Sequence, residues 1–142
     1  DANGVVAQAA KRLGIGIYDV RDEASAVFAA DEPTDELALS EAEILELVRE
    51  KSTECRKEKD QSICANYFSE EGVIKRLDED GSRRQGVWFV DDSDRLCILW
   101  QGKIKPLCFF VIPQDDGTYH LIKKGKHVTS ILSTEDGNTK NQ

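Results

Sequence analysis

Short β-rich runs separated by turn signals dominate the chain from residue 65 onward and constrain its fold more than any other feature. Seven such runs are Asn66–Ser69, Val73–Leu77, Gly86–Val90, Leu96–Trp100, Leu107–Ile112, Tyr119–Ile122 and Val128–Leu132. Asp-Gly pairs at Asp80-Gly81 and Asp116-Gly117 favour tight turns between antiparallel strands. The pattern therefore predicts an antiparallel meander of about six to seven strands.

Two of these runs, Val87–Val90 and Cys108–Ile112, are apolar on both faces. An antiparallel sheet with one face in water alternates apolar and polar residues more cleanly. We therefore expect the sheet either to curl toward a barrel or to be covered by a helix. Both arrangements fit an α+β class, in which one or more N-terminal helices pack on a curled, disulfide-tied meander.

A capped helix precedes the meander. Ser40 is a good N-cap, and Glu43 three residues later completes a capping box. Apolar residues then recur at helical spacing and predict one buried stripe: Ile44, Leu45, Leu47 and Val48. Because basic residues suit the C-terminal end of a helix, Arg49 and Lys51 extend the predicted helix to about residue 51.

The length of 142 residues fits a single domain. We expect residues 1–38 to form a weakly ordered arm, residues 39–134 the core, and residues 135–142 a frayed tail without apolar side chains. The sequence contains no methionine, so Asp1 is not an initiator residue. We expect a processed mature form whose signal peptide has been removed, or an excised segment.

The four cysteines have local partners. If strands pair symmetrically about Gly102-Lys103, Cys97 falls opposite Cys108. Pro106 has no N–H to donate to the opposite strand. A four-residue loop, Gln101–Ile104, places Pro106 at a non-hydrogen-bonded position of the strand pair, where no N–H is required. The sequence thus predicts a Cys97–Cys108 disulfide across this hairpin.

A second disulfide, Cys55–Cys64, is expected around the polar segment that follows the helix. Closing a loop of about ten residues stabilises a fold by roughly 2–3 kcal/mol. Buried free thiols are one alternative, and a metal or catalytic cysteine is another. Neither cysteine spacing matches the Cys-x2–4-Cys pairs that are typical of metal sites. An even number of cysteines with local partners indicates an oxidising compartment, so we expect a periplasmic or secreted protein.

The charge balance limits the partners. The net charge is −8, from 27 acidic and 19 basic residues, which argues against nucleic acid and anionic membrane surfaces as partners. No apolar run approaches the roughly 18–20 residues of a membrane-spanning helix. We expect no membrane span, no cofactor and no bound metal.

Aromatic residues provide the strongest candidates for a ligand site. Six cluster in the predicted meander, and all of them except Phe89 are taken as candidate ligand-binding residues: Trp88, Phe89, Trp100, Phe109, Phe110 and Tyr119. If the sheet curls, these side chains would line a cavity for a small ligand. The alternative is that they pack in an ordinary core.

Other groups of residues are weaker candidates for a functional site. His120 and His127 suggest a pH-sensitive or general-base site, or ordinary strand residues. Two charged turns are further candidates: the lysines at 123, 124 and 126 for an anion site or a solvated turn, and the aspartates at 91, 92 and 94 for a calcium loop or a solvated acidic turn. Position 96 is not the glycine that an EF-hand needs, and residues 14–16 lack the rest of a dinucleotide fingerprint. We assign no catalytic residue.

The linear pattern resembles a family of small exported bacterial proteins catalogued only as a domain of unknown function. The resemblance covers about residues 39–122 and rests on these motifs: Leu39-Ser40-x-x-Glu43-Ile44, Tyr67-Phe68-x-x-x-Gly72, Gly86-x-Trp88, Leu96-Cys97-x-x-Trp100, Cys108 and Asp116-Gly117-x-Tyr119. It implies export and a cysteine-tied β-meander. It supplies no catalytic residues and no equivalent of the Cys55–Cys64 pair.

These observations favour an exported, non-catalytic binding module that holds a small apolar or amphipathic ligand, or a protein partner, on its aromatic-rich meander. An inhibitor or accessory subunit of an exported enzyme is the alternative, because rigid disulfide-tied loops lose little entropy on binding. A small hydrolytic enzyme is the third hypothesis. It would need His120 or His127 in a cleft beside a carboxylate.

Overall fold

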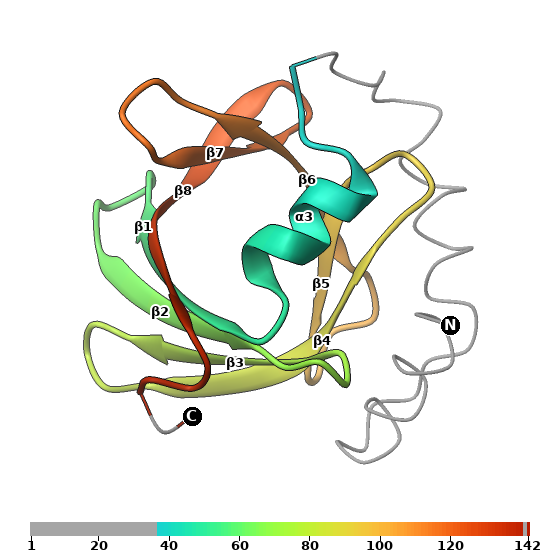
Figure 1. The fold of residues 1–142 in the computed structure, drawn as a ribbon. Coiled ribbons are helices and arrows are strands. Elements are labelled where there is room, and N and C mark those ends of the chain that lie inside the picture. The colour runs from blue at the N-terminus through green and yellow to red at the C-terminus, as the bar shows by residue number, and fades with distance from the viewer. Residues whose placement is uncertain (1–36, 141) are drawn as a thin grey trace.

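The computed structural model describes residues 37–140 and residue 142. One helix and eight strands follow one another: α3 (Glu41–Val48), β1 (Lys51–Lys57), β2 (Ile63–Phe68), β3 (Val73–Asp78), β4 (Arg83–Val90), β5 (Leu96–Trp100), β6 (Leu107–Pro113), β7 (Tyr119–Lys123) and β8 (Lys126–Asp136). Each strand pairs antiparallel with the next, and β8 returns to pair with β1 (Figure 1). The sheet is therefore a closed barrel.

The predicted α+β class is wrong. The described chain is a closed eight-stranded antiparallel barrel with one short helix, rather than one or more helices packed on a curled meander of about six to seven strands. The strands are apolar on both faces because both faces are buried. In β4, Trp88 points into the barrel and Phe89 points outward, yet their exposed fractions are only 4% and 2%.

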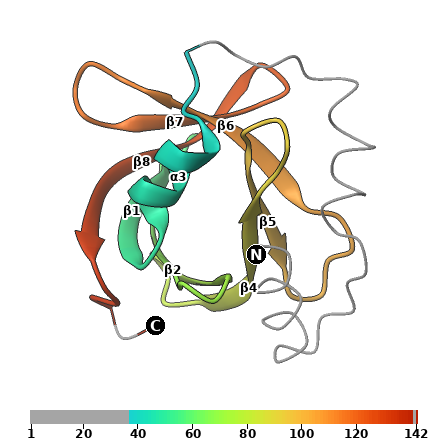
Figure 2. The same cartoon turned by 45° about the vertical axis from the view of Figure 1, so that its right-hand side comes forward.

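Strand β1 is not predicted by the sequence pattern. The helix ends at Val48, three residues earlier than predicted, because Arg49 is extended and Glu50 has a positive φ of 61°. The chain then enters β1, which lies between β2 and β8 (Figure 2). Its sequence, Lys-Ser-Thr-Glu-Cys-Arg-Lys, has no apolar alternation, so nothing in the local pattern marks it as a strand.

Helix α3 lies across one end of the barrel (Figure 1). The predicted capping box is confirmed, since the Ser40 side chain accepts from the Glu43 backbone N–H and Glu43 accepts from the Ser40 N–H. Ile44 and Val48 have no exposed surface and pack with the side chains that fill this end. Two further backbone N–H groups anchor the helix start, Leu39 to the Val111 carbonyl at 2.8 Å and Glu41 to an Asp94 carboxylate oxygen at 3.0 Å.

Strand β8 extends into the segment 135–142, for which the sequence predicts a frayed tail. Strand β8 runs to Asp136, which pairs with Lys51 at the start of β1. Beyond it, the Gly137 N–H donates to the Glu50 carbonyl, and the Ser52 hydroxyl donates to the Gly137 carbonyl at 2.7 Å. Pairing with β1 supplies the backbone partners that a free tail would lack. The expected N-terminal arm lies almost wholly outside the described residues.

Both predicted disulfides are confirmed, and each joins directly opposed residues of one hairpin. Cys55 faces Cys64 across β1 and β2, and Cys97 faces Cys108 across β5 and β6. The predicted four-residue loop is too short, however. The β5–β6 ladder stops at Ile98 and Leu107, so residues 101–106 form the turn and Pro106 stands outside the ladder. Proline without an N–H ends the pairing rather than joining it.

The up-and-down topology sends alternate turns to opposite ends of the barrel. The turns at 69–72, 91–95 and 114–118 lie at the end covered by α3, which we call the helix end; they hold seven acidic residues and one basic residue. The turns at 58–62, 79–82, 101–106 and 124–125 lie at the other end, which we call the open end; they hold four acidic and four basic residues. Charge is therefore segregated along the barrel axis.

Gly86 sets the spacing between β4 and β5. It faces into the barrel opposite Trp100, and a Cβ at this position would lie 2.9 Å from the Trp100 Cα and closer still to the Leu99 carbonyl oxygen.

We expect Gly86→Ala to force these strands apart and lower the free energy of unfolding by about 1–3 kcal/mol, measured by urea denaturation. Glu54→Ala, at an exposed position of β1, should change it by less than about 0.5 kcal/mol. Equal stability of Gly86→Ala and the wild type would contradict the close approach.

Candidate functional site

A cavity of about 440 Å³ occupies the barrel interior toward the open end. This volume lies in the range of about 300–1,000 Å³ that is typical of small-molecule sites. Its apolar wall includes Phe68, Ile98, Trp100, Phe109, Leu121 and Ile131. Exposed Lys59 and Asp60, on the β1–β2 turn, also line it, so the cavity reaches solvent at this end.

Polar side chains cross the inner wall in a single row. Thr53 pairs with Asn66, Asn66 with Arg76, and Arg76 with Arg84, on strands β1 to β4. All four line the cavity, and we call them the polar row. Neighbouring strands lie roughly 4.8 Å apart, so these side chains are close neighbours. The arrangement results from register, which brings together four positions far apart in the sequence.

Arg76 is the most unusual member of the polar row. Its Nε donates to Asn66 Oδ1 at 2.9 Å, and its guanidinium carbon lies 4.8 Å from the centre of the Trp100 ring. Among the described residues, no carboxylate lies within 4 Å of this guanidinium. Burial, opposed by Asp78 and assisted by Arg84, lowers the pKa of Arg76 to about 10. The side chain therefore remains charged at neutral pH.

Thr53 contributes a second incompletely satisfied group. The residue is 2% exposed, and its hydroxyl oxygen has no hydrogen-bond partner within residues 37–140 and 142. A buried polar atom without a partner costs stability, so native proteins contain few of them. Thr53 and Arg76 thus give one stretch of the inner wall spare hydrogen-bonding capacity.

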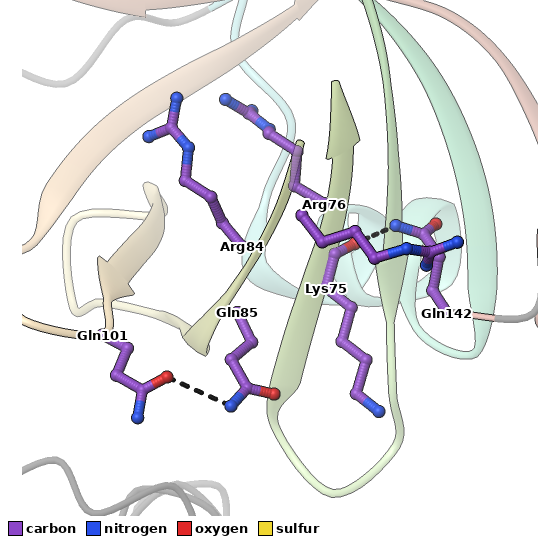
Figure 3. Close-up of a pocket in the computed structure, with 7 residues that line it drawn as sticks. Lys75, Arg76, Arg84, Gln85, Gln101 and Gln142 are labelled. Carbon is purple, nitrogen blue, oxygen red and sulfur yellow. Dashed lines mark hydrogen bonds between the residues drawn. The ribbon is translucent and has the colours of Figure 1, made fainter. Parts of the chain in front are cut away.

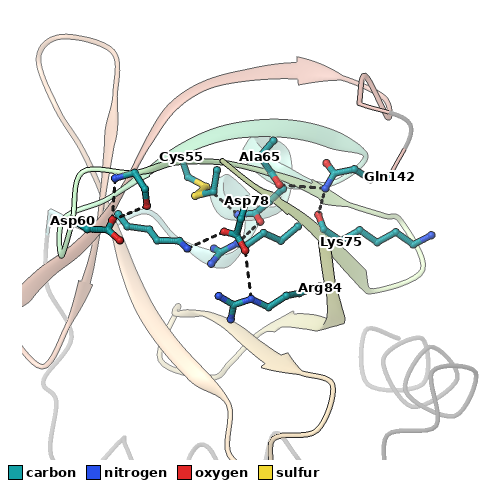
Figure 4. Close-up of a disulfide and its surroundings, with 12 residues drawn as sticks. Cys55, Asp60, Ala65, Lys75, Asp78, Arg84 and Gln142 are labelled. Carbon is teal, nitrogen blue, oxygen red and sulfur yellow. Dashed lines mark hydrogen bonds and ion pairs between the residues drawn. A yellow bond between two sulfur atoms is a disulfide. The ribbon is translucent and has the colours of Figure 1, made fainter. Parts of the chain in front are cut away.

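Ion pairs connect the strands at the open end. Asp78 accepts from Lys57 Nζ at 2.8 Å and lies 3.6 Å from Arg84 Nε, so it lies between the two cations (Figure 4). Arg84 also lies 5.6 Å from the centre of the Trp100 ring. Figure 4 shows the Cys55–Cys64 disulfide beside this network, and Asn66 Nδ2 lies 3.5 Å from Cys55 Sγ. The acid near Arg76 is therefore already shared by two other cations.

The five predicted aromatic residues separate into different environments. Trp100 and Phe109 line the cavity, as a ligand site requires. Trp88 is buried near α3, where its indole donates to the Ser69 carbonyl at 3.0 Å, and Tyr119 packs half-buried against the core. Phe110 points to the outer face, 6.0 Å from the Arg95 guanidinium. The polar row was not predicted, because a charged residue within a strand looks solvent-facing until its register is known.

The two histidines lie on the outer surface, since the adjoining Leu121 points into the barrel. Their rings stack with centroids 3.7 Å apart. His127 Nε2 lies 2.8 Å from the Ser130 hydroxyl oxygen and 3.6 Å from a Glu58 carboxylate oxygen. Both oxygens face the same ring nitrogen, whereas in a serine–histidine–acid triad the acid contacts the opposite nitrogen.

The aspartate turn of residues 91–95 serves the fold. Asp91 and Arg95 form a fully buried ion pair, with Arg95 Nη2 2.6 Å from Asp91 Oδ2. Asp91 Oδ1 also accepts from the backbone N–H groups of Ser93 and Arg95. Cys97 and Cys108 come close to Asp91, but both sulfurs are committed to a disulfide and are not available as metal ligands.

A second hollow of about 360 Å³ is lined only by basic and amide side chains (Figure 3). Arg84 and Gln85 point to opposite sides of β4 there, and Gln85 Nε2 donates to Gln101 Oε1 at 3.1 Å. Because this hollow lacks an apolar wall, it offers little to the carbon skeleton of a ligand. The barrel cavity is the better candidate site.

The stacked histidines make a testable contribution to stability. Burial, together with the charge of His127, lowers the pKa of His120 below its ordinary value of 6.5. The unfolded chain therefore binds this proton at higher pH, so the contribution of neutral His120 is complete above about pH 6.5 and is lost as the pH falls through the lowered pKa. We expect urea denaturation to show a lower free energy of unfolding at about pH 5.5 than at about pH 7.5.

His120→Gln and His127→Gln should each reduce that difference. Glu58 does not contribute to the difference between about pH 5.5 and about pH 7.5. A hydrogen bond from Gln61 is the main cause that lowers the pKa of Glu58 below its ordinary value of 4.5, so this carboxyl titrates below that pH range. The same pH dependence in both variants as in the wild type would show that the stack does not control it.

In the described part of the chain, no helix has the length and apolar character needed to cross a membrane. Two disulfides are typical of an oxidising, extracellular environment. No protein-family model, curated protein or solved structure matches this chain.

Proposed function

We propose that this protein is an exported, non-catalytic module that binds a small apolar or amphipathic molecule inside its barrel. The supporting observation is the cavity of about 440 Å³, in which Trp100 and Phe109 form part of an apolar wall beside polar groups. Removing apolar ligand surface from water contributes roughly 25 cal/mol per Å² to the favourable free energy of binding. An apolar wall with a few convergent polar groups is the usual composition of such a site.

The closed barrel favours binding because it is organised before the ligand arrives. Every strand has a partner on both sides, and two hairpins are cross-linked by disulfides. A site that needs little ordering on binding loses less conformational entropy, so more of the contact energy appears as affinity. The same disulfides support a periplasmic or secreted location.

A small ligand explains the structure better than a protein partner does. The interior is not filled, and within residues 37–140 and 142 the large apolar side chains that are exposed are Leu37, Ile104 and Leu107. Scattered apolar side chains are normal on protein surfaces, whereas a protein interface usually shows a continuous patch. An inhibitor or accessory subunit would bind through such a surface and would have no need of the cavity.

A neutral probe tests the cavity without involving its charges. We expect 1-decanol to bind the wild type and to quench or shift tryptophan fluorescence, because Trp100 lines the cavity. Val128→Trp should abolish binding by filling the cavity from its wall. Ile122→Trp, with a similar gain in size on a half-buried β7 position that does not line the cavity, should leave the affinity within about threefold of the wild type. Isothermal titration calorimetry and fluorescence would measure both.

Two outcomes would overturn the proposal: no binding of decanol by the wild type, or equal binding by the two tryptophan variants. Native mass spectrometry of protein exported by a host cell provides an independent check. We expect additional mass in the native spectrum that is lost on denaturation.

A further inference from the structure

The cavity is electropositive although the protein is acidic. Its ionisable lining residues are four basic side chains and one acid: Lys57, Lys59, Arg76, Arg84 and Asp60. The whole chain carries a net charge of −8. An excess of positive charge along the wall and mouth of a cavity raises the local concentration of anions. The concentration of cations at this one place therefore favours an anionic ligand over a neutral one.

Arg76 lacks a countercharge of its own. Its Nε is occupied by Asn66 Oδ1, while its two terminal nitrogens have no hydrogen-bond acceptor among the described residues. Asp78, the neighbouring acid, is engaged by Lys57 and Arg84. Arg76 is half-buried, and a charge withdrawn from water is costly unless it is paired and hydrogen-bonded. An acceptor supplied from outside the chain would offset this cost.

We propose that the ligand is an amphipathic monocarboxylate whose carboxylate binds the terminal nitrogens of Arg76 and whose hydrocarbon part lies against the apolar wall of the barrel. The inference depends on the proposed function, because it names the ligand class of the same cavity. A guanidinium matches the two oxygens of a carboxylate in a bidentate pair. The buried Thr53 hydroxyl of the same polar row, which has no partner in the part of the chain that the structure describes, offers a further donor to that headgroup.

One anionic charge suits the site better than two. Arg84 and Lys57 are partly neutralised by Asp78, so Arg76 is the cation of the polar row that lacks a carboxylate within 4 Å in the described structure. The apolar wall continues from Trp100, which lies 4.8 Å from the Arg76 guanidinium, toward Phe68 and Ile131 in the core. Charged and apolar contacts are thus adjacent, as a molecule with one acidic end and a hydrocarbon body requires.

The experiment compares decanoate with 1-decanol by isothermal titration calorimetry on the wild type, Arg76→Gln and Arg83→Gln. We expect the wild type to bind decanoate more tightly than decanol. Arg76→Gln should weaken decanoate roughly 10- to 150-fold, the effect of losing a hydrogen-bonded charged partner. It should leave decanol within about threefold of the wild type. Arg83→Gln removes the same charge from an exposed site on the neighbouring strand β4, and should change decanoate affinity by less than about threefold.

The outcomes separate this inference from the proposed function. If decanol binds but decanoate binds no more tightly to the wild type, the carboxylate assignment is wrong and the apolar cavity stands; this comparison needs no variant to fold. Equal decanoate affinity in Arg76→Gln and Arg83→Gln would overturn the role of Arg76. If neither molecule binds the wild type, both proposals fail. Circular dichroism and thermal unfolding establish that each variant is folded before it is titrated.

Discussion

Pairing between β1 and β8 is the constraint on which the rest of this structure depends. Without it the chain would be an open sheet with two free edges, and its inner face would be a surface rather than an enclosed volume. Closure is accompanied by register shifts between Glu54 and Cys55 on β1 and between Leu121 and Ile122 on β7. Such bulges increase local twist and help a sheet to curl. The cavity, the polar row and the position of α3 all follow from closure.

Inside the barrel, residue size and charge divide the space along the axis. Large apolar side chains fill the helix end and pack on Ile44 and Val48 of α3. Toward the open end, Gly86 lets β4 approach β5 closely, so that the opposed Trp100 lies beside both Arg76 and Arg84. A guanidinium over an indole ring gains cation–π attraction, which partly compensates for burial of the charge. One glycine thereby helps to hold an arginine within an apolar interior.

Much of this fold was predictable because its signals are local. The capping box at Ser40 and Glu43, strand β5 with the same bounds, and the register that opposes Cys97 to Cys108 all follow from patterns within a few residues. Strand β1 was not predictable, since it is polar and is held by pairing with β8, far along the chain. The fold class was wrong for the same reason: closure depends on that long-range pair.

The candidate site was only partly predictable. Aromatic character drew attention to Trp100 and Phe109, which line the cavity, but composition could not distinguish them from Phe110, which faces outward. Arg76 gave no signal, because the direction of a side chain in a strand is fixed only when register and closure are known. The polar row joins four strands and exists as a group only in three dimensions.

Helix α3 is anchored across the helix end of the barrel (Figure 1), whereas the cavity reaches solvent at the open end. Hydrogen bonds hold the helix start to β6 and the β4–β5 turn, and the Glu50 N–H donates to the Phe68 carbonyl at 2.7 Å just beyond its end. A molecule inside the cavity would therefore leave through the open end, past the exposed side chains of Lys59 and Asp60. Asp78 forms ion pairs with Lys57 and Arg84 at this end, and ion pairs near solvent weaken as the salt concentration rises. The residence time of a ligand would therefore depend on ionic strength, whereas its contacts with the apolar wall would not.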